Sequence, residues 1–336
     1  DHRDLHSFPT RRSSDLTFKQ KYAGKSGKLR ADAYLKQLIE RVMIRNTREN
    51  TDLKPSNRQI ETVWIDLTPE EKNVYQRLEN LDIAYDTFTK MTLLREICSS
   101  REACYLSLAK LQQSRGDDGQ IQAIVDSLNQ LPHHSKAQKV VELIQHIGDE
   151  KVIIFTEYRA TQLYLQWYLQ QHGITSVPFS GGFKRSKKDW MIQLFKEKAQ
   201  VLIATEAGAE GINLQFCHHM INYDLPWNPM KIEQRIGRIH RFGQENDVKI
   251  YNLAILNTIE EHILNILYEK IALFENVIGE LDAILAELNI PDFDQAIESI
   301  YAESESMGEA KIKLENLVSI VKQMADEEKA AGDIYE

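Results

Sequence analysis

The chain has 336 residues, of which 42% are hydrophobic and 27% are charged, as in most folded globular proteins. Its apolar runs reach only four residues, which excludes a membrane-spanning helix, and no apolar signal core is present near the start, so we expect a cytoplasmic protein. The net charge is −9 for the whole chain and −14 for residues 251–336, so residues 1–250 carry +5. A basic region over residues 1–250 followed by an acidic tail favours an anionic partner for residues 1–250.

The beginning of the chain is predicted to lie outside the main fold. Residues 1–16 show no periodicity and resemble the translation of a sequencing adapter, so we expect a disordered, non-native segment. In residues 17–54 a helix is predicted at 31–46, and it leads into the polar link NTRENTDLKPSN, whose proline is Pro55.

A strand and a helical insertion come next. Apolar and polar residues alternate after Arg58, which predicts a strand. Thr68 is then a predicted N-cap, with Pro69 in the first turn and Glu71 completing a capping box. Helical periodicity continues from there, so we predict a helical insertion over about 69–131.

The following part of the chain alternates helices with short apolar strands. Helices are predicted at 135–147 and 160–171, and the predicted strands contain KVIIF, SVPF, VLIA, HMINY and VKIYNL. Unbroken apolar strands separated by helices are typical of a parallel sheet covered on both faces. We therefore predict an α/β fold with a RecA-like lobe over residues 55–256.

Residues 257–336 are predicted to form an acidic helical tail. Apolar residues recur with alternating spacings of four and three from Leu267 to Leu288, and Pro291 ends this pattern. The pattern fits a helix packed on the lobe better than a coiled-coil seam, because it extends over few heptads. A second helix is predicted to run through Val321.

The stretch EQRIGRIHRFGQ, residues 233–244, is the first candidate for chemistry. If it is helical, Gln234, Arg238 and Arg241 share one face, while isoleucines anchor the other side on the sheet. Two arginines on one stripe repel each other, but a phosphate group would bind both through paired hydrogen bonds. The alternative is a solvated basic helix face.

Two glycine-containing loops follow predicted strands, where open α/β sheets bind ligands. In TEAGAEGINLQ, Gly208 and Gly211 allow a ligand to approach the backbone, and Glu210 is placed to accept a hydrogen bond from a ribose. In SGGFKRSKK, residues 180–188, four cations beside two glycines are suited to nucleic-acid phosphates. The alternatives are an ordinary turn in the first case and a solvated loop in the second.

Several patterns are rejected as sites. Gly24-Lys25-Ser26 lacks the leading glycine and the preceding strand of a P-loop. Asp149 and Glu150 precede a strand, whereas Mg²⁺ carboxylates are expected after one. The histidine pairs and the three cysteines lack metal-ligand spacing, so we expect no metal site and buried, reduced thiols.

Taken in order, ATEAGAEGINLQ, INYDLPWNP and QRIGRIHRFGQ resemble motifs of the second motor lobe of Swi/Snf-type superfamily-two helicases. KVIIFTEYRATQLYL is similar to motif IV of that family, and the resemblance covers about residues 36–290. Within the family, the tail is most similar to bacterial members related to the RNA-polymerase-recycling ATPase.

The resemblance implies roles at the nucleotide. Arg238 and Arg241 match arginines that reach the ATP γ-phosphate, with Arg241 as the arginine finger. Gln234 would position the nucleotide. The glycine loop, Gly208 to Gly211 with Glu210, would lie near it.

The resemblance also implies contacts with nucleic acid. Thr156, Tyr158 and Lys184 would touch strand phosphates, as would the Ser180-Gly181 turn and Thr205. The implied substrate is double-stranded DNA, and the other implied partners are the missing first lobe and RNA polymerase or another protein. Trp227 and Asn228 would link the motifs structurally.

Two departures from the family pattern affect these expectations. Ala209 replaces a glycine, which the loop tolerates if φ is negative. Nothing resembles the P-loop or the Asp-Glu motif that hold ATP and Mg²⁺, so we expect this fragment alone to be inactive. The alternative function is a non-enzymatic RecA-like module that binds nucleic acid or protein; a remodeller that acts through the acidic tail is a third possibility.

Overall fold

The computed structural model describes residues 57–81, 87–115, 119–209, 212–241, 243–265, 293–304 and 306–332. The chain divides into two units, residues 1–54 and 55–336, and every described residue belongs to the second. The predicted non-native segment, the helix at 31–46 and the apolar pattern from Leu267 to Leu288 lie outside the described residues.

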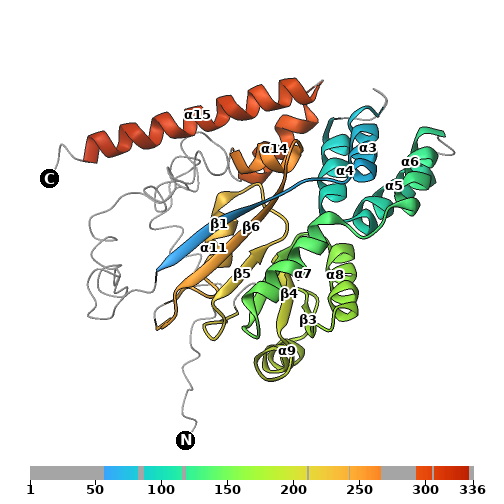
Figure 1. Ribbon diagram of the computed structural model, residues 1–336. Coiled ribbons are helices and arrows are strands. Elements are labelled where there is room, and N and C mark those ends of the chain that lie inside the picture. Colours follow the sequence, from blue (N-terminus) through green and yellow to red (C-terminus); the bar gives the residue numbers. More distant parts are fainter. Residues whose placement is uncertain are drawn as a thin grey trace, which may run out of the picture. The chain divides into compact units, whose positions relative to one another are not determined.

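A six-stranded, wholly parallel sheet forms the core of this unit (Figure 1). Its strand order is β1-β6-β5-β2-β4-β3. The strands are β1 (Arg58–Ile65), β2 (Val152–Thr156), β3 (Ser176–Phe179), β4 (Val201–Thr205), β5 (His219–Asn222) and β6 (Val248–Ile255). Every residue of β2 and β5 is buried, which explains their unbroken apolar sequences. The predicted parallel α/β class and RecA-like lobe are confirmed.

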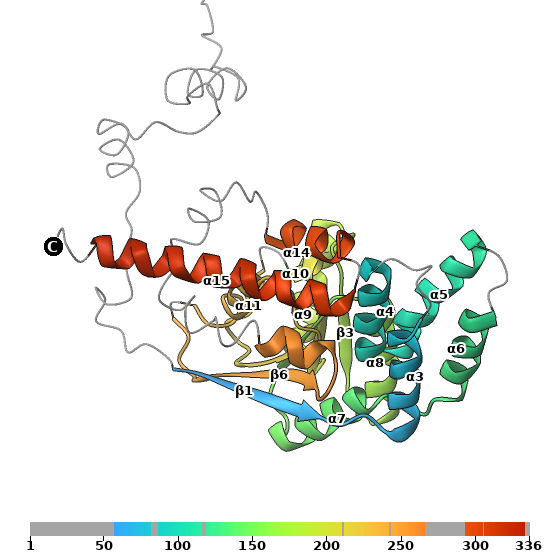
Figure 2. The same cartoon turned by 90° about the horizontal axis from the view of Figure 1, so that it is seen from above.

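Helices cover both faces of the sheet (Figure 2). One face carries α7 (Ser135–Ile147) and α8 (Arg159–Gln171), and the other carries α9 (Arg185–Glu197) and α11 (Pro229–Ile236). This division follows from right-handed crossovers, because the chain moves outward from β2 to β3 and then back to β4. None of the described helices is long and apolar enough to span a membrane.

The predicted helical insertion consists of α3 (Pro69–Glu79), α4 (Thr87–Ser99), α5 (Arg101–Arg115) and α6 (Gly119–Gln130). Its start is the predicted capping box: the Glu71 N–H donates to Thr68 Oγ1 at 3.2 Å, and the Thr68 N–H donates to Glu71 Oε2 at 2.9 Å. These two bonds pair backbone N–H groups that the helix itself leaves without partners.

Two tail helices are described, α14 (Phe293–Ala302) and α15 (Met307–Gly332). Tyr301 of α14 is fully buried, and its ring centroid lies 5.2 Å from that of Trp227. The Thr87 hydroxyl donates to the Ser304 carbonyl at 2.6 Å. The helix α14 is therefore packed against both the lobe and the insertion.

Glu96 of α4 is a buried carboxylate at the centre of the insertion. Only 7% of the residue is exposed, and its Oε1 accepts from the Ser107 hydroxyl at 2.8 Å. Its Oε2 has no hydrogen bond within the described part of the chain. Burial raises the pKa of Glu96 to about 7, against an ordinary value of 4.5.

The raised pKa predicts a pH-dependent stability. The folded chain holds a proton that the unfolded chain releases, so this contribution is complete below pH 4.5 and is lost as the pH rises through about 7. Glu96→Gln should therefore raise the free energy of unfolding by about 3 kcal/mol above that pH, with little effect near pH 4.5. Urea unfolding at several pH values measures this. The exposed Glu142→Gln is the control, and a pH-independent effect of Glu96→Gln would contradict the assignment.

Candidate functional site

The register of the sheet brings Thr156, Thr205 and the residue before Ser180 to one edge. Thr156 at the end of β2 pairs with Thr205 at the end of β4, and Phe179 at the end of β3 pairs with Ala204. Because the strands are parallel, their carboxyl ends lie together, as expected for a ligand site in an open sheet. The short helix α10 (Glu206–Ala209) begins directly after β4.

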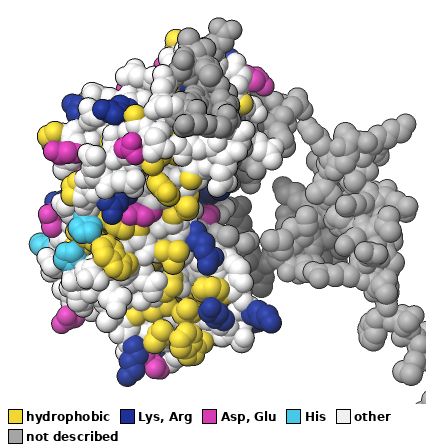
Figure 3. Space-filling view, turned by 90° about the vertical axis from the view of Figure 1, so that its right-hand side faces the viewer, with side chains coloured by type: hydrophobic (Ala, Val, Ile, Leu, Met, Phe, Trp, Pro, Cys, Tyr) yellow, Lys and Arg dark blue, Asp and Glu magenta, His cyan; other side chains and the backbone are white. Residues whose placement is uncertain are grey.

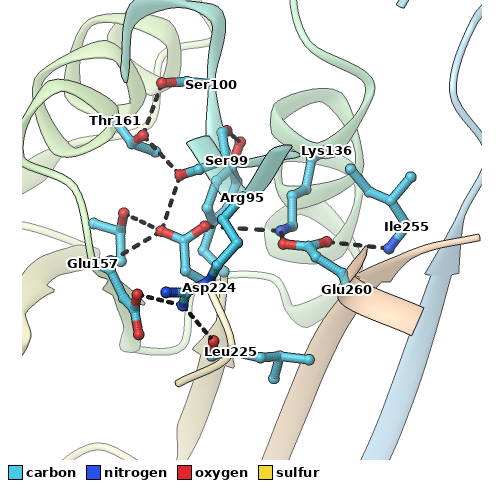
Figure 4. Close-up of polar contacts among 12 residues, drawn as sticks. Arg95, Ser99, Ser100, Lys136, Glu157, Thr161, Asp224, Leu225, Ile255 and Glu260 are labelled. Carbon is cyan, nitrogen blue, oxygen red and sulfur yellow. Dashed lines mark hydrogen bonds and ion pairs between the residues drawn. The ribbon is translucent and has the colours of Figure 1, made fainter. Parts of the chain in front are cut away.

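Asp224, which follows β5, is a buried acceptor at this edge (Figure 4). Its Oδ2 accepts from the Thr156 hydroxyl at 2.5 Å, from the Glu157 N–H at 2.9 Å and from the Ser99 hydroxyl at 3.0 Å. Thr156 has no exposed surface, so its side chain is not accessible to a ligand in this structure. Its hydroxyl holds Asp224 instead of facing a phosphate.

Charged residues from the insertion and the lobe extend this network. The Lys136 ammonium is fully buried, forms an ion pair with Glu260 and lies 3.8 Å from Asp224 Oδ1. Arg95 of α4 pairs with Glu157 at 2.5 Å, and its guanidinium lies 4.8 Å from the Trp227 ring centroid. These contacts fix the strand ends and the loop before α11 to the helical insertion (Figure 4).

The end of β3 is held by Gln162 of α8. The Gln162 side-chain amide donates to the carbonyls of Phe179 at 3.1 Å and Ile203 at 2.7 Å, and the Ser180 hydroxyl donates to its oxygen at 2.8 Å. Ser180 is only 5% exposed, so its side chain is structural here. Tyr158, Gly181 and Thr205 are partly exposed.

Exposed cations gather at the start of α9. Lys184 is its N-cap residue, with no side-chain cap, and the first turn contains no acidic residue. Arg185 and Lys187 are exposed, and Lys188 Nζ lies 3.4 Å from the Gly208 carbonyl. The partial positive charge of a helix N-terminus adds to these cations, so this end of the helix attracts anions.

Gly208 lies where the structure has no room for a side chain. A Cβ on Gly208 would lie 2.5 Å from the Phe179 carbonyl oxygen and 2.9 Å from Ser180 Cα. Ala209 belongs to α10, so its backbone is helical and alanine is tolerated there. Glu210 and Gly211 lie outside the described residues.

The close packing predicts that Gly208→Ala is destabilising. Backbone atoms must move to admit the methyl group, which is expected to lower the free energy of unfolding by about 1–3 kcal/mol. Gly119→Ala is a matched control, because no atom lies within 4 Å of the added Cβ. Chemical denaturation of both variants measures the difference. Equal stabilities would show that the loop relaxes freely around residue 208.

The stretch 233–244 is only partly helical. The prediction of one helix with Gln234, Arg238 and Arg241 on a single stripe is wrong, because α11 ends at Ile236 and turns follow. The Arg238 carbonyl accepts from the Leu214 N–H at 3.0 Å instead of continuing the helix. Tertiary hydrogen bonding thus overrides the helical periodicity of the sequence.

The three arginines of this stretch have different surroundings. Arg235 is only 1% exposed and forms an ion pair with Glu206. Arg238 is partly exposed, and its side chain makes no hydrogen bond or ion pair with the described part of the chain. Arg241 is exposed, with its Nε donating to the Gly237 carbonyl at 2.8 Å, and Gln234 is exposed as well. The last two arginines therefore retain donors for a ligand.

Sequence reasoning missed four polar residues that shape the site: Asp224, Gln162, Glu206 and Gln244. Each is buried or partly buried and bonds to a residue distant in sequence, as the 29-residue separation of Glu206 and Arg235 illustrates. The Asp after strand HMINY was the one visible signal, because a charged residue directly after a buried strand must find partners.

A groove lies on another side of the lobe, between α5, α6 and α8. It encloses about 630 Å³ and includes four well-exposed apolar side chains, Tyr105, Leu106, Leu163 and Trp167. Lys and Arg side chains are interspersed with hydrophobic ones on the side where these helices lie (Figure 3). None of the residues predicted to act on nucleotide or nucleic acid lines this groove.

The cysteine prediction is confirmed. Cys98, Cys104 and Cys217 are free and buried, and burial raises the pKa of each thiol, that of Cys217 to about 12. Within the described ranges, no group of His, Cys, Asp or Glu side chains is arranged to hold a metal ion.

Known proteins are similar to this chain over the region that holds the strand-end loops and α11. The family described as "Helicase conserved C-terminal domain" matches residues 135–243. A Bacillus subtilis protein named "Uncharacterized ATP-dependent helicase YqhH" is 53% identical over 323 residues, which cover 93% of this chain and 58% of that protein. The RNA polymerase-associated protein RapA of Proteus mirabilis is 34% identical over 182 residues, covering 49% of this chain and 18% of RapA.

Among solved structures, the C-terminal part of the Fun30 ATPase domain aligns with a TM-score of 0.48 at 18% identity, covering 62% of this chain and 89% of that one. The chain spans a little over half the length of the B. subtilis relative and less than a fifth of RapA. The parallel sheet and the order of its strand-end motifs agree with the family match. Residues 135–243 therefore match a helicase C-terminal domain, and the chain is similar to bacterial proteins named as an ATP-dependent helicase and as the RNA polymerase-associated protein RapA.

Proposed function

We propose that this chain is the second lobe of an ATP-dependent translocase that acts on double-stranded nucleic acid. In this function Arg238 and Arg241 contact the phosphates of ATP, while the loops at the strand ends and the start of α9 contact the nucleic-acid backbone. The observation that carries the proposal is the pair of partly free guanidinium groups directly after α11.

The arginines suit a phosphate group because a guanidinium is permanently charged and donates paired hydrogen bonds. The Arg238 guanidinium is unpaired within the described residues, and that of Arg241 uses one donor on Gly237. In phosphoryl transfer, negative charge on the transferred group is stabilised by such donors. Gln234, exposed on the same segment, is proposed to help position the nucleotide.

ATP with Mg²⁺ supplies the transferable phosphoryl group and a cation that neutralises its charge. Among the described residues, those that suit the nucleotide are cationic or backbone donors rather than carboxylate clusters. We therefore assign β-phosphate and Mg²⁺ binding to a first lobe, and expect this chain alone to hydrolyse no ATP. Gly208, Glu210 and Gly211 are proposed to border the nucleotide.

The nucleic-acid contacts are proposed for the partly exposed or exposed residues at the ends of β2, β3 and β4: Tyr158, Gly181, Lys184 and Thr205. Arg185 and Lys187 extend this surface along α9. Such contacts go to phosphates and carry no sequence information. Thr156 and Ser180 are proposed to support these loops from below, because their hydroxyls are bonded within the protein.

The relatives suggest partners and a location. RapA is named as RNA polymerase-associated, and we propose RNA polymerase as a candidate partner for the whole protein of which this lobe is part. A bacterial cytoplasmic location fits such a partner.

A chimaera tests the proposed function. In it, this chain from residue 17 onward replaces the matching part of the B. subtilis relative, which supplies the rest of the protein. We expect ATP hydrolysis that double-stranded DNA stimulates at least about tenfold, since a tenfold change in rate is a barrier change of about 1.4 kcal/mol. A chimaera that binds DNA but never hydrolyses ATP would favour the non-enzymatic binding module.

A further inference from the structure

Arg235 occupies an unusual position for a charged residue. It lies in the last turn of α11 with 1% of its surface exposed, and its guanidinium lies 5.1 Å from the Phe155 ring centroid of β2. Its Nε and Nη2 each lie 2.8 Å from Glu206 Oε2, after β4. Its Nη1 donates to Asn222 Oδ1 at 3.2 Å and to the Asp224 carbonyl at 2.8 Å. One side chain thus joins α11 to the ends of three strands.

The bond to Glu206 is one of three ties between the same two segments. The first is the Glu206–Arg235 ion pair. The second is the Leu214 N–H, which donates to the Arg238 carbonyl at 3.0 Å. The third is the buried Gln244 amide, which donates to the Gln215 carbonyl at 2.9 Å. The loop after β4, at Glu206, Leu214 and Gln215, is therefore bonded to the arginine segment at Arg235, Arg238 and Gln244.

Stability alone does not explain this arrangement. Burying a guanidinium costs several kcal/mol, and a well-packed apolar residue usually stabilises a core as well or better. A guanidinium nevertheless fixes direction, because its planar fork donates to an acceptor after β4 and to another on β5 at once. Its partner Glu206 is 36% exposed, on the loop rather than in the core. The pair is suited to setting the position of one segment relative to the other.

We propose that Arg235, held by Glu206, is a positioning residue that fixes where Arg238 and Arg241 lie relative to the loop after β4. The proposal rests on the proposed function for its consequence in ATP hydrolysis, but its structural content is independent of it. Arg235 itself is not expected to touch the nucleotide, because it is buried and its Nε and Nη1 donate to Glu206, Asn222 and the Asp224 carbonyl. In this proposal Arg235 positions the segment, and Arg238 and Arg241 bind the nucleotide.

Hydrogen–deuterium exchange on the complete 336-residue chain tests the structural part. In Glu206→Gln, amides of residues 237–241 should exchange at least about tenfold faster, which corresponds to about 1.4 kcal/mol of local opening. Amides in β2, β5 and β6 should keep their protection. Arg235→Lys should behave in the same way, because an ammonium keeps the charge but loses the fork. Glu245→Gln removes an equal charge from an exposed residue nearby and should change nothing.

The chimaera tests the functional part. Glu206→Gln should lower kcat at least about tenfold while KM for ATP changes less than about threefold, the pattern of an interaction needed in the transition state. Glu206→Asp should restore part of the loss. Affinity for DNA should stay within about twofold of the unsubstituted chimaera, because every proposed phosphate-binding side chain is retained.

Three outcomes overturn the proposal. The first is unchanged exchange at residues 237–241 in Glu206→Gln. The second is a uniform rise of exchange in all strands, which identifies a merely structural ion pair. The third is an unchanged kcat in an active chimaera. If the unsubstituted chimaera hydrolyses no ATP, the proposed function fails, whereas the exchange experiment still decides whether Arg235 positions the segment.

Discussion

Arg241→Ala in the chimaera is expected to lower kcat for ATP hydrolysis by about a thousandfold or more, because an arginine finger contributes on this scale in related phosphoryl transfers. The Arg241 side chain is exposed, and its one bond within the described structure is to the nearby Gly237 carbonyl. Folding should therefore be unaffected, and the loss should appear in the chemical step. Steady-state hydrolysis with saturating ATP and DNA measures it, and thermal unfolding verifies the fold.

Two further variants sharpen this result. Arg241→Lys keeps the charge but loses bidentate geometry, so its kcat should remain closer to that of alanine than to that of arginine. Arg77→Ala removes an exposed arginine on α3 that donates to the Ser127 hydroxyl of α6, and it should leave kcat unchanged. If kcat of Arg241→Ala stays within about threefold of the unsubstituted chimaera, Arg241 does not stabilise the transition state. A threefold change in rate is a barrier change of only about 0.7 kcal/mol.

The second large effect is expected in DNA binding. Replacing Lys184, Arg185 and Lys187 by alanine should weaken the affinity of the chain for double-stranded DNA by about ten- to a hundredfold at low salt. The slope of log K against log salt should also become shallower, by about 0.9 for each phosphate that the variant no longer neutralises. The three side chains are exposed, so folding should be unaffected. Fluorescence anisotropy between about 50 and 200 mM salt measures both quantities.

The opposite end of the same helix supplies the control. Lys196 and Lys198 are exposed cations near the C-terminus of α9, and replacing them with alanine should change the affinity by less than about threefold. Equal losses of affinity from the replacements at both ends of α9 would mean that DNA binding depends only on the net charge of the lobe. An unchanged affinity in the triple variant would remove the start of α9 from the interface.

Much of the fold follows from local sequence patterns. The capping box at Thr68 and Glu71 and the apolar strand runs were predictable, because capping depends on residues three apart and buried parallel strands need unbroken apolar runs. The end of α11 was not predictable. The periodicity through Ile239 favours a longer helix, but the Arg238 carbonyl bonds to Leu214 and the helix stops at Ile236.

The candidate site also contains residues that the sequence predicts and residues whose contacts it does not predict. Glycine at position 208 and arginines at 238 and 241 stood out by residue type and by their place after strands, since those features are local. The commitment of Thr156 to Asp224 and of Ser180 to Gln162 could not be foreseen, because each partner lies on another element. A hydroxyl at a strand end bonds equally well to a phosphate or to a buried carboxylate.

The sequence by itself determined the class of the chain, a parallel α/β lobe with ordered strand-end motifs. The class is recognisable because apolar strand runs and the order of the motifs are properties of the linear sequence. The tertiary structure alone decided which arginine is buried. Arg235, Arg238 and Arg241 are chemically identical and closely spaced, and among the described residues only Arg235 meets acceptors at the ends of β4 and β5. The physical reason is that burying a charge requires partners on every side, and such partners are assembled only when distant segments fold together.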